Sequence, residues 1–449
     1  MFEHPGRTAN RTARRLRAVS ALVALSMAAA LAACSSSPST GAGASSHSTL
    51  IFADVAPFSG VDAALGPIYL VSCTGATNAI NAAGGILGHK VACMSKDTRG
   101  EPADALPAVG SLLANTKNLE LVIGCTSDEA ASVVPLLNQK KTVMFCMTGQ
   151  SEFDHVKYPY FYRLVPPDLA ESYAMTVIAQ KLGYSKIALA FGNDIGSQTF
   201  VQPALAAIAK AGLHVVANVT LDLKATTFRT EAAKIVAAHP DAIMTEALGN
   251  ADPTLFAEIK QLNNGHMIPL IGTSAAISPV FYTASAKAVG AAQFAANFHA
   301  DNLVTATSGP AYDAFTKALL AVKGKVSGAQ TGNFTTYFTA PGAVHLYDGM
   351  NLAALAMVAA HSTDVAKWKP WIAKIGDGVP GAVVVSSYAQ GVAALKAGKQ
   401  IRYIGPGGPT SFDAYHDSPG IFQIDTYSPT GAVLVAGSIS ADQLRAVTP

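Results

Sequence analysis

The sequence predicts an α/β fold with two lobes, each built on a doubly wound parallel sheet. Short apolar runs typical of strands alternate with helical segments from Leu50 to Leu106, and a second series of this kind begins at Lys186. The length of 449 residues also exceeds what one hydrophobic core usually organises. Ligands of such sheets bind beyond the carboxyl ends of the strands, so any binding site is expected there.

The opening unit begins with an apolar strand at Leu50–Ala56, which the turn residues Pro57–Gly60 end. Pro67 suits the first turn of the following helix, because its missing N–H has no partner to lose there. Gly84-Gly85 ends that helix, since glycine adopts the left-handed conformation of a helix C-terminus without steric strain. A second strand is expected at Lys90–Met94, followed by a further helix.

The remaining strands of both lobes are short apolar runs, and most are followed by a helical segment. In the first lobe they are Leu119–Gly124, Thr142–Cys146 and Tyr160–Val165, with a helix at Ser127–Asn138. In the second lobe they are Lys186–Phe191, His214–Val219, Ala242–Glu246 and Ile268–Gly272, with helices at Thr227–Ala238, Pro253–Asn263 and Ser278–Ala288. This alternation predicts parallel strands with right-handed crossovers in each lobe.

The chain is expected to pass between the lobes three times. It leaves the first lobe near Asp168, returns at Ala291–Phe298 and crosses again near Phe412. Helices at Ala311–Val322 and His345–His361 belong to the first lobe, and the apolar part of the latter is interpreted as a buried core helix.

The N-terminus has the pattern of a secretory signal. Five arginines precede an uncharged run from Ala18 to Ala33, and Leu31-Ala32-Ala33-Cys34 closes that run like a lipobox. We therefore interpret residues 1–33 as a lipoprotein signal peptide, Cys34 as the lipidated residue and the Ser/Gly/Ala-rich residues 34–48 as a flexible tether. An ordinary signal peptide with a chance cysteine is the alternative. The first interpretation predicts an exported domain, held by lipid on the outer face of the cytoplasmic membrane.

The charge balance gives no argument for a nucleic-acid partner. Residues 1–33 hold five of the 31 Lys and Arg residues and one of the 29 Asp and Glu residues, so the rest of the chain has a formal charge of −2. No apolar run in that remainder is long enough to span a bilayer.

Four cysteines remain after Cys34, and outside the cytoplasm an even number favours disulfides. Of three possible pairings we favour Cys73–Cys93, which joins the first helix to the second strand, and Cys125–Cys146, which joins adjacent strand ends. Four small buried thiols are the alternative. The spacing does not fit a zinc site, so no metal is expected.

No catalytic motif is present. The sequence contains no G-x-S-x-G, H-E-x-x-H or G-x-x-x-x-G-K-[ST] pattern, so no catalytic residue and no cofactor are assigned. His155, His266 and His345 are interpreted as surface or loop residues.

Several ordered motifs resemble the branched-chain amino acid (Leu/Ile/Val) solute-binding proteins of ABC importers. They are Pro57–Gly60, Ala79–Lys90 with its "INAAGGILGHK" run, and Asp97–Ala103, followed much later by Leu346–Ala356 and the "G–G–F–D" turn of Gly405–Asp413. The resemblance implies a type I periplasmic-binding-protein fold, with two doubly wound parallel-sheet lobes joined by a three-stranded hinge. It places residues 49–166 and 299–412 in lobe 1, and residues 167–298 and 413–449 in lobe 2.

That resemblance also implies a function. A small organic ligand would dock on one lobe, the hinge would close, and an ABC permease with its ATPase subunits would receive the ligand from a monomeric receptor. A ligand sensor of the same fold that signals to a membrane receptor is one alternative, and an extracytoplasmic enzyme acting in the cleft is another.

In the resembled family, two neighbouring strand-end turns hold the carboxylate of the ligand. The matching residues are Thr126 and Ser127 in the first turn, and Thr148, Gly149 and Gln150 in the second. Hydroxyls at a helix N-terminus suit an anion, because N–H groups and the positive end of the helix dipole gather there. Helix capping alone is the alternative for Thr126 and Ser127.

The acid that receives the ammonium group of the ligand in such receptors is missing here. Ser274 stands in the position where it is expected, and Glu246 at the end of another strand could replace it. A solvated strand-end carboxylate is the alternative for Glu246. Asp128 and Glu129 are interpreted as first-turn acids that complement a helix dipole.

Phe58, Leu65, Ile195 and Leu248 complete the expected ligand-binding set. Leu65 and Ile195 replace aromatic residues that often cover the ligand's side chain in the resembled family. The pocket is therefore expected to be less polar and less selective for cations than that of a leucine receptor. The ligand is expected to be an amino acid, a related amide, or an aromatic or apolar solute.

Overall fold

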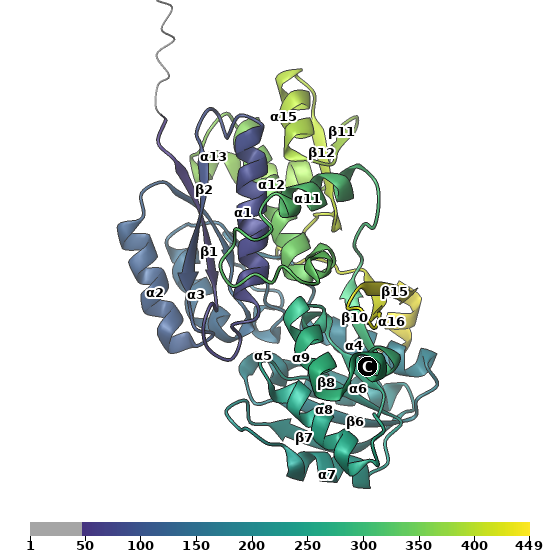
Figure 1. The fold of residues 1–449 in the computed structure, drawn as a ribbon. Coiled ribbons are helices and arrows are strands. Elements are labelled where there is room, and N and C mark those ends of the chain that lie inside the picture. Colours follow the sequence, from purple (N-terminus) through teal and green to yellow (C-terminus); the bar gives the residue numbers. More distant parts are fainter. Residues whose placement is uncertain (1–46) are drawn as a thin grey trace, which may run out of the picture. The chain divides into compact units, whose positions relative to one another are not determined.

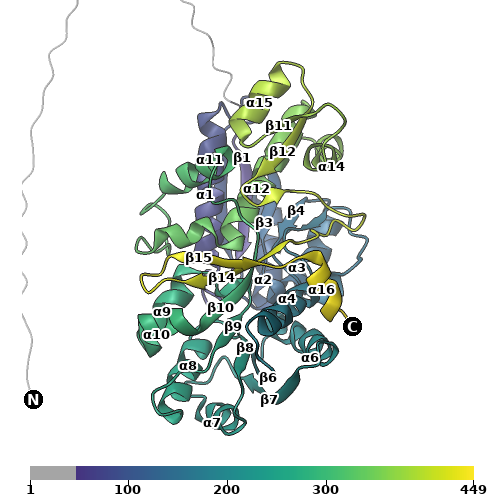
Figure 2. The same ribbon diagram turned by 90° about the vertical axis from the view of Figure 1, so that its right-hand side faces the viewer.

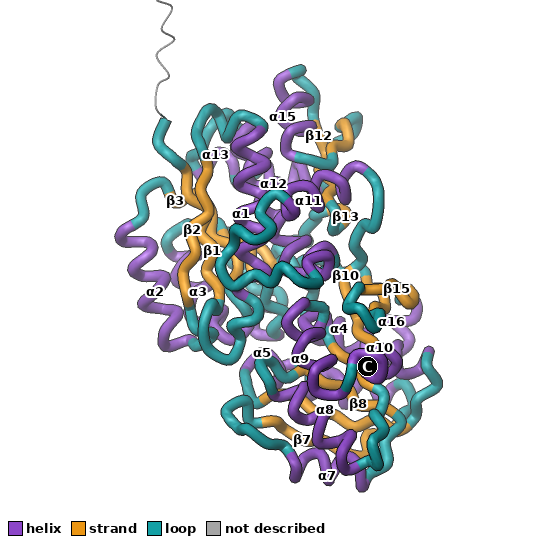
Figure 3. Tube along the Cα trace, in the orientation of Figure 1, coloured by secondary structure: helices purple, strands orange, loops and turns teal. Residues whose placement is uncertain are grey.

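The computed structural model describes residues 47–449, and their strands and helices alternate from the first strand onward (Figures 1 and 3). The predicted signal peptide, Cys34 and most of the predicted tether lie outside the described residues. Two large sheets and one small sheet organise the described part of the chain.

The first sheet has five strands, and every neighbouring pair is parallel. In spatial order they are β2 (Val91–Asp97), β1 (Leu50–Ala56), β3 (Leu119–Gly124), β4 (Met144–Cys146) and β5 (Phe161–Arg163). All five begin within one residue of the predicted strands except β4, which begins two residues later. The parallel arrangement brings the carboxyl ends of β1, β3 and β4 to one edge of the sheet.

Successive side chains of a strand point to opposite faces of the sheet, and the two faces of this sheet are covered by different helices. The helices are α1 (Gly66–Ala82), α2 (Pro102–Asn115), α3 (Ser127–Gln139) and α12 (Pro341–Ala359). Phe52 and Leu121 pack into the core with α1 and α12. Ala53 and Val122 pack into the opposite core with α2 and α3. The prediction that α12 is a buried core helix is confirmed, because its residues are buried around almost the whole circumference.

The second sheet has seven strands and a mixed arrangement. In spatial order they are β15 (Val433–Ser438), β14 (Phe422–Tyr427), β10 (Phe298–Leu303), β9 (Leu270–Gly272), β8 (Ala242–Glu246), β6 (Lys186–Gly192) and β7 (His214–Leu221). The four predicted strands β6 to β9 are parallel as expected, and β10, which was not predicted, pairs with β9 in parallel as well. The pairing of β14 with β10 and with β15 is antiparallel, and neither of these two strands was predicted.

Helices cover both faces of the second sheet as well. They are α4 (Asp168–Lys181), α5 (Ile195–Thr199), α6 (Val201–Lys210), α7 (Arg229–Ala237), α8 (Ala251–Leu262), α9 (Pro279–Val289), α10 (Ala291–Asn297) and α16 (Ala441–Val447). Alternate residues of β6 again separate the two cores. Leu189 packs with α4, α6 and α16, whereas Ala190 packs with α7 to α10.

The remaining elements extend the first lobe beyond α12 (Figure 2). They are α11 (Pro310–Leu320), α13 (Val365–Trp368), α14 (Trp371–Gly376), α15 (Tyr388–Lys396) and a small sheet of β11 (Val383–Val385), β12 (Ile401–Gly405) and β13 (Gly408–Pro409). Trp368, Ile372 and Tyr388 join the core that α1 and α12 form, so these elements belong with the first sheet.

The predicted return crossing at Ala291–Phe298 is wrong. Residues 291–297 form α10, and β10 at Phe298–Leu303 pairs with β9 and β14 in the second sheet. The chain therefore leaves the second sheet only after Leu303, and residues 299–303 do not belong to lobe 1. The other two passages run from β5 to α4 and from β13 to β14.

Both favoured cysteine pairs are disulfides in the structure. Cys73 of α1 is bonded to Cys93 of β2 with a Cα–Cα distance of 5.8 Å. Cys125 and Cys146, which lie at the carboxyl ends of β3 and β4, are bonded with a Cα–Cα distance of 5.4 Å. The second bond ties together the two turns that carry the predicted carboxylate-binding residues.

None of the helices in residues 47–449 combines the length and the apolar composition that crossing a bilayer requires.

Candidate functional site

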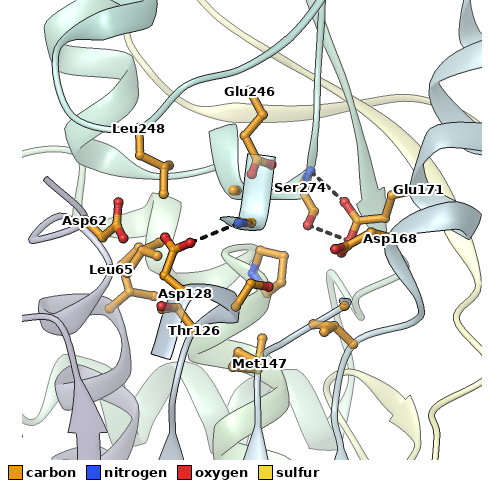
Figure 4. Close-up of a pocket in the computed structure, with 18 of the residues that line it drawn as sticks. Asp62, Leu65, Thr126, Asp128, Met147, Asp168, Glu171, Glu246, Leu248 and Ser274 are labelled. Carbon is orange, nitrogen blue, oxygen red and sulfur yellow. Dashed lines mark hydrogen bonds between the residues drawn. The ribbon is translucent and has the colours of Figure 1, made fainter. Parts of the chain in front are cut away.

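A cavity of about 100 Å³ lies where the carboxyl ends of strands from both large sheets meet. Its walls come from the turn before α1, the N-termini of α3, α4 and α5, the end of β8 and the short 3-10 turn Ser274–Ala276 (Figure 4). The site therefore lies at the strand ends, where parallel sheets of this kind bind ligands.

The structure brings seven of the predicted ligand-binding residues to this cavity and leaves four outside its lining. The seven are Leu65, Thr126, Ser127, Gly149, Glu246, Leu248 and Ser274. Phe58 instead packs against the core of the first lobe, and Ile195 is 46% exposed at the start of α5. Thr148 and Gln150 are buried directly behind the lining, where the Oγ1 atom of Thr148 lies 3.2 Å from the Oγ atom of Ser127.

The hydroxyl groups at the end of β3 have different partners. Thr126 occupies the N-cap position of α3 without a side-chain cap hydrogen bond, and it donates to the Glu129 carboxyl instead. Thr98 donates to the other oxygen of Glu129 at 3.1 Å. Capping therefore does not explain Thr126, whereas Ser127 keeps its hydroxyl at the cavity wall.

Six carboxyl groups line the cavity, and no Lys or Arg among residues 47–449 does. They are Asp62, Asp128, Asp168, Glu171, Asp194 and Glu246. This lining does not fit the expectation of a pocket that is less selective for cations. The sequence shows that an acid is missing at Ser274. It does not show that loops and helix N-termini place other acids around this position.

Asp62 and Asp128 form a carboxyl pair on one side of the cavity. Asp62 is 1% exposed, and neither of its oxygens accepts a hydrogen bond from a donor in the described residues. Burial, followed by the neighbouring charge of Asp128 and the weaker influence of Asp194 and Glu129, raises the pKa of Asp62 to about 9. In Asp128, the Oδ1 atom accepts a hydrogen bond from the backbone N–H of Gly196 at 3.0 Å.

Glu171 and Asp168 lie on the opposite side, in the first turn of α4 (Figure 4). Ser274 donates to Glu171 from its backbone N–H at 3.3 Å and from its hydroxyl at 3.1 Å. Burial is the main cause that raises the pKa of Glu171, and its carboxyl faces that of the fully buried Asp301. Glu171 thus supplies a carboxyl directly beside the serine that replaces the expected acid.

Asp168 occupies the space above the second predicted carboxylate-binding turn. A Cβ atom on Gly149 would collide with its carboxyl group, so only glycine fits there. Thr199 donates a hydrogen bond to Asp168, and burial raises the pKa of this carboxyl to about 8. A ligand carboxylate at this turn would meet a carboxyl group rather than a cation.

Glu246 is 9% exposed, so the alternative of a solvated strand-end carboxylate is wrong. Thr273 donates a hydrogen bond to it, and burial raises its pKa well above the ordinary value of a glutamate. It lies between the two carboxyl sides in Figure 4 and faces the same cavity.

The interpretation of His345 as a surface or loop residue is wrong. It lies within α12 and is partly buried, and desolvation lowers its pKa to about 4. His155 and His266 are exposed, as predicted.

The fold and the site define a two-lobed α/β binding protein whose cavity is closed by residues of both lobes. The chain belongs to the periplasmic binding protein family, whose model matches residues 53–416. This is a family of extracytoplasmic binding proteins, and the type I fold expected from the sequence is confirmed. No curated protein sequence matches the chain significantly.

Solved structures of binding proteins share this fold at low sequence identity. The substrate-binding protein LivJ of a branched-chain amino acid transporter from Streptococcus pneumoniae, in complex with isoleucine, is 19% identical, with a TM-score of 0.67 over 87% of this chain and 99% of that chain. The leucine-binding protein LivK from Thermotoga maritima is 17% identical, with a TM-score of 0.69 over 88% and 99%. An ABC-transporter solute-binding protein from R. palustris, in complex with benzoate, is 17% identical, with a TM-score of 0.67 over 87% and 96%.

Proposed function

We propose that this protein is the solute receptor of an ABC importer, and that it captures a small organic solute in the cavity between its lobes. The observation that carries the proposal is the composition of the cavity wall. Ser127 and Asp128 come from the first lobe, whereas Gly196, Glu246 and other lining residues come from the second. A ligand in this cavity would contact both lobes and would favour the closed form by its differential affinity.

One contact between the lobes would form or break as the cavity closes or opens. The backbone N–H of Gly196 donates to Asp128 across the lobes, and the Gly196 backbone approaches Ser127 closely. Leu65 and Leu248 add apolar walls from opposite lobes. Closure would present a surface that a permease distinguishes from the open form, and ATP hydrolysis would belong to its partner subunits.

The location follows from the sequence pattern rather than from the fold. Lipidation of Cys34 would hold the receptor on the outer face of the cytoplasmic membrane, near its permease. The protein would act as a monomer on a tether formed by residues 34–48, with its two lobes joined by the three passages between the sheets.

Thermal unfolding of the purified full chain against a panel of solutes tests this function. The panel contains leucine, valine, small amides, aromatic acids and amines. A solute at about a hundred times its dissociation constant should raise the free energy of unfolding by roughly 2.7 kcal/mol. Native mass spectrometry of the protein as purified would detect a retained solute. The absence of both a stabilising solute and a retained one would contradict the receptor function.

A further inference from the structure

Four of the six carboxyl groups of the cavity lie in two pairs on opposite sides. Asp62 and Asp128 lie on one side, and Asp168 and Glu171 on the other (Figure 4). Among residues 47–449, no group of three or more acidic, His or Cys side chains has the arrangement of a metal site. The occupant must therefore reach both sides, which a single metal ion does not do.

Within residues 47–449, no Lys or Arg side chain lines the cavity to neutralise these carboxyl groups. The nearest buried cation that influences them is Arg163, which lowers the pKa of Asp168 only as a minor cause. The guanidinium of Arg163 is fully buried and engaged by Asp154 at 2.8 Å and by Asp417 at 3.3 Å. A cationic ligand would supply the positive charge that stabilises these carboxyl groups in their ionised form.

Protonated Asp62 donates a hydrogen bond to Asp128, but it accepts none itself. Its carboxyl is almost completely buried at the cavity wall, and both oxygens lack a hydrogen-bond donor among the described residues. Buried carboxyl oxygens normally have such partners. An ammonium group of a ligand would supply the N–H donors and the opposite charge at the same time.

Apolar side chains form another part of the cavity wall. Met147, Val165 and Phe200 line the same cavity. A hydrocarbon segment between two ammonium groups would bury its surface against these side chains. At the Gly149 turn, a ligand carboxylate would meet the carboxyl group of Asp168.

We propose that the cavity binds a small organic dication of the alkyl diamine class, with one ammonium group at Asp62 and Asp128 and the other at Asp168 and Glu171. This inference rests on the proposed receptor function and names the solute. Glu246, hydrogen-bonded by Thr273, adds negative charge between the two ends.

Binding of this ligand releases protons. Around Asp62 the charged and titratable groups are Asp128, Asp194, Glu129 and Tyr69, and around Glu171 they are Asp168, Asp301 and Glu246. Because these neighbours are acids or a neutral phenol, the empty cavity retains protons near neutral pH. A dication favours the ionised carboxyls, so its affinity rises with pH while its ammonium groups stay charged.

Isothermal titration calorimetry of the full chain with putrescine tests the inference, with n-butylamine and the uncharged diol of the same length as matched comparisons. Putrescine should bind at least about tenfold more tightly than n-butylamine, because the monoamine leaves one acidic set without a partner. The diol should not bind. Titrations in two buffers of different ionisation enthalpy should show protons released by putrescine.

Two variants and one control test where the two ammonium groups of putrescine bind. Asp62→Asn and Glu171→Gln should each weaken putrescine binding about tenfold or more and remove most of its advantage over n-butylamine. Asp348→Asn is the matched control, because Asp348 is equally buried on α12 but accepts its hydrogen bonds from Tyr403 and Gly407 outside the cavity. Circular dichroism establishes that each variant is folded. The comparison of putrescine with n-butylamine uses the wild-type protein and does not depend on the variants.

Three results would overturn the diamine. They are equal affinities for putrescine and n-butylamine, tighter binding of leucine or benzoate, and displacement of putrescine by Mg²⁺ at constant ionic strength. The first two would leave the receptor function intact, since a solute would still be captured. If no compound binds and no solute is retained, the receptor function itself fails.

Discussion

Among the acids that line the cavity, some could be predicted from the sequence and others could not. Glu246 was found because it ends a strand, and strand ends of parallel sheets meet at the ligand edge. Asp168 and Glu171 carried a usable signal, since two acids one turn apart after Pro166-Pro167 are typical of a helix N-terminus. Asp62 had none, because it lies in an irregular turn whose conformation depends on the packing around it.

At the same scale, Ser127 and Gln150 can be separated by experiment. Ser127 lines the cavity, whereas the side chain of Gln150 lies behind Thr148. Ser127→Ala should weaken binding of the stabilising solute by roughly 1 kcal/mol, the usual contribution of one hydrogen bond. Gln150→Ala should leave affinity nearly unchanged. Titration calorimetry with one ligand decides this, and the reverse order of effects would place the ligand elsewhere.

Among the elements, those with a clear apolar pattern were predicted and those with buried polar residues were not. β10 contains His299, Asp301 and Asn302, which the sequence interpretation placed in lobe 1, directly after the expected crossing. Asn302 is buried with a partner from a distant segment, because its side-chain amide donates to Asp425 at 2.7 Å. Such pairing over long sequence separation leaves no local signal, so β10 and the antiparallel edge strands could not be predicted.

The N-terminus of α5 should control closure. A Cβ atom added at Gly196 would lie 3.2 Å from the Cβ atom of Ser127, so the closed form would have to relax. If Gly196→Ala destabilises that form by roughly 1.4 kcal/mol, the apparent affinity falls about tenfold. Gly110→Ala on α2 is the control, since no atom lies within 4 Å of its added Cβ. Equal affinities of the two variants in calorimetry would argue against this closing contact.

The two disulfides should differ in their effect on binding. Replacing either pair by alanine should lower stability by roughly 2–4 kcal/mol, because the unfolded chain gains freedom. Only loss of Cys125–Cys146 should also weaken ligand binding, since this bond ties the turns after β3 and β4. Loss of Cys73–Cys93, between α1 and β2, should not. Denaturant unfolding and calorimetry on both double variants provide the comparison. A larger binding defect after loss of Cys73–Cys93 than after loss of Cys125–Cys146 would refute this prediction.

For the whole molecule, the distribution of charge decides the function more than the net charge does. Composition predicted a nearly neutral domain, and the fold class followed from alternating patterns along the chain. The concentration of acids at one cavity could not be read from composition, because it arises when loops and helix N-termini from two lobes meet. Cavity chemistry is thus a property of the folded chain.

Burial of these acids should make the ligand-free protein less stable as the pH rises from about 6.5 to about 9. Over this range the unfolded chain has ionised carboxylates, whereas the folded chain retains protons on buried acids, so unfolding releases protons. The pKa is raised to about 9 for Asp62, to about 8 for Asp168 and Asp348, and to about 7 for Glu120 and Asp252. His345, whose pKa is lowered to about 4 in the folded chain, opposes this trend only near the lower end of the range, where the unfolded imidazole still binds protons.

Thermal unfolding at a series of pH values in this range measures the trend. The midpoint should fall as the pH rises, and saturating putrescine should reduce the fall, because the dication stabilises the ionised carboxyls. A midpoint that rises with pH would show that the cavity acids are ionised without a ligand.

Closure around the solute is the central claim, and small-angle X-ray scattering tests it most directly. The purified full chain should show a smaller radius of gyration with saturating putrescine than without it, and Gly196→Ala should need more putrescine for the same change. An unchanged radius of gyration while calorimetry shows putrescine bound would contradict capture between the lobes.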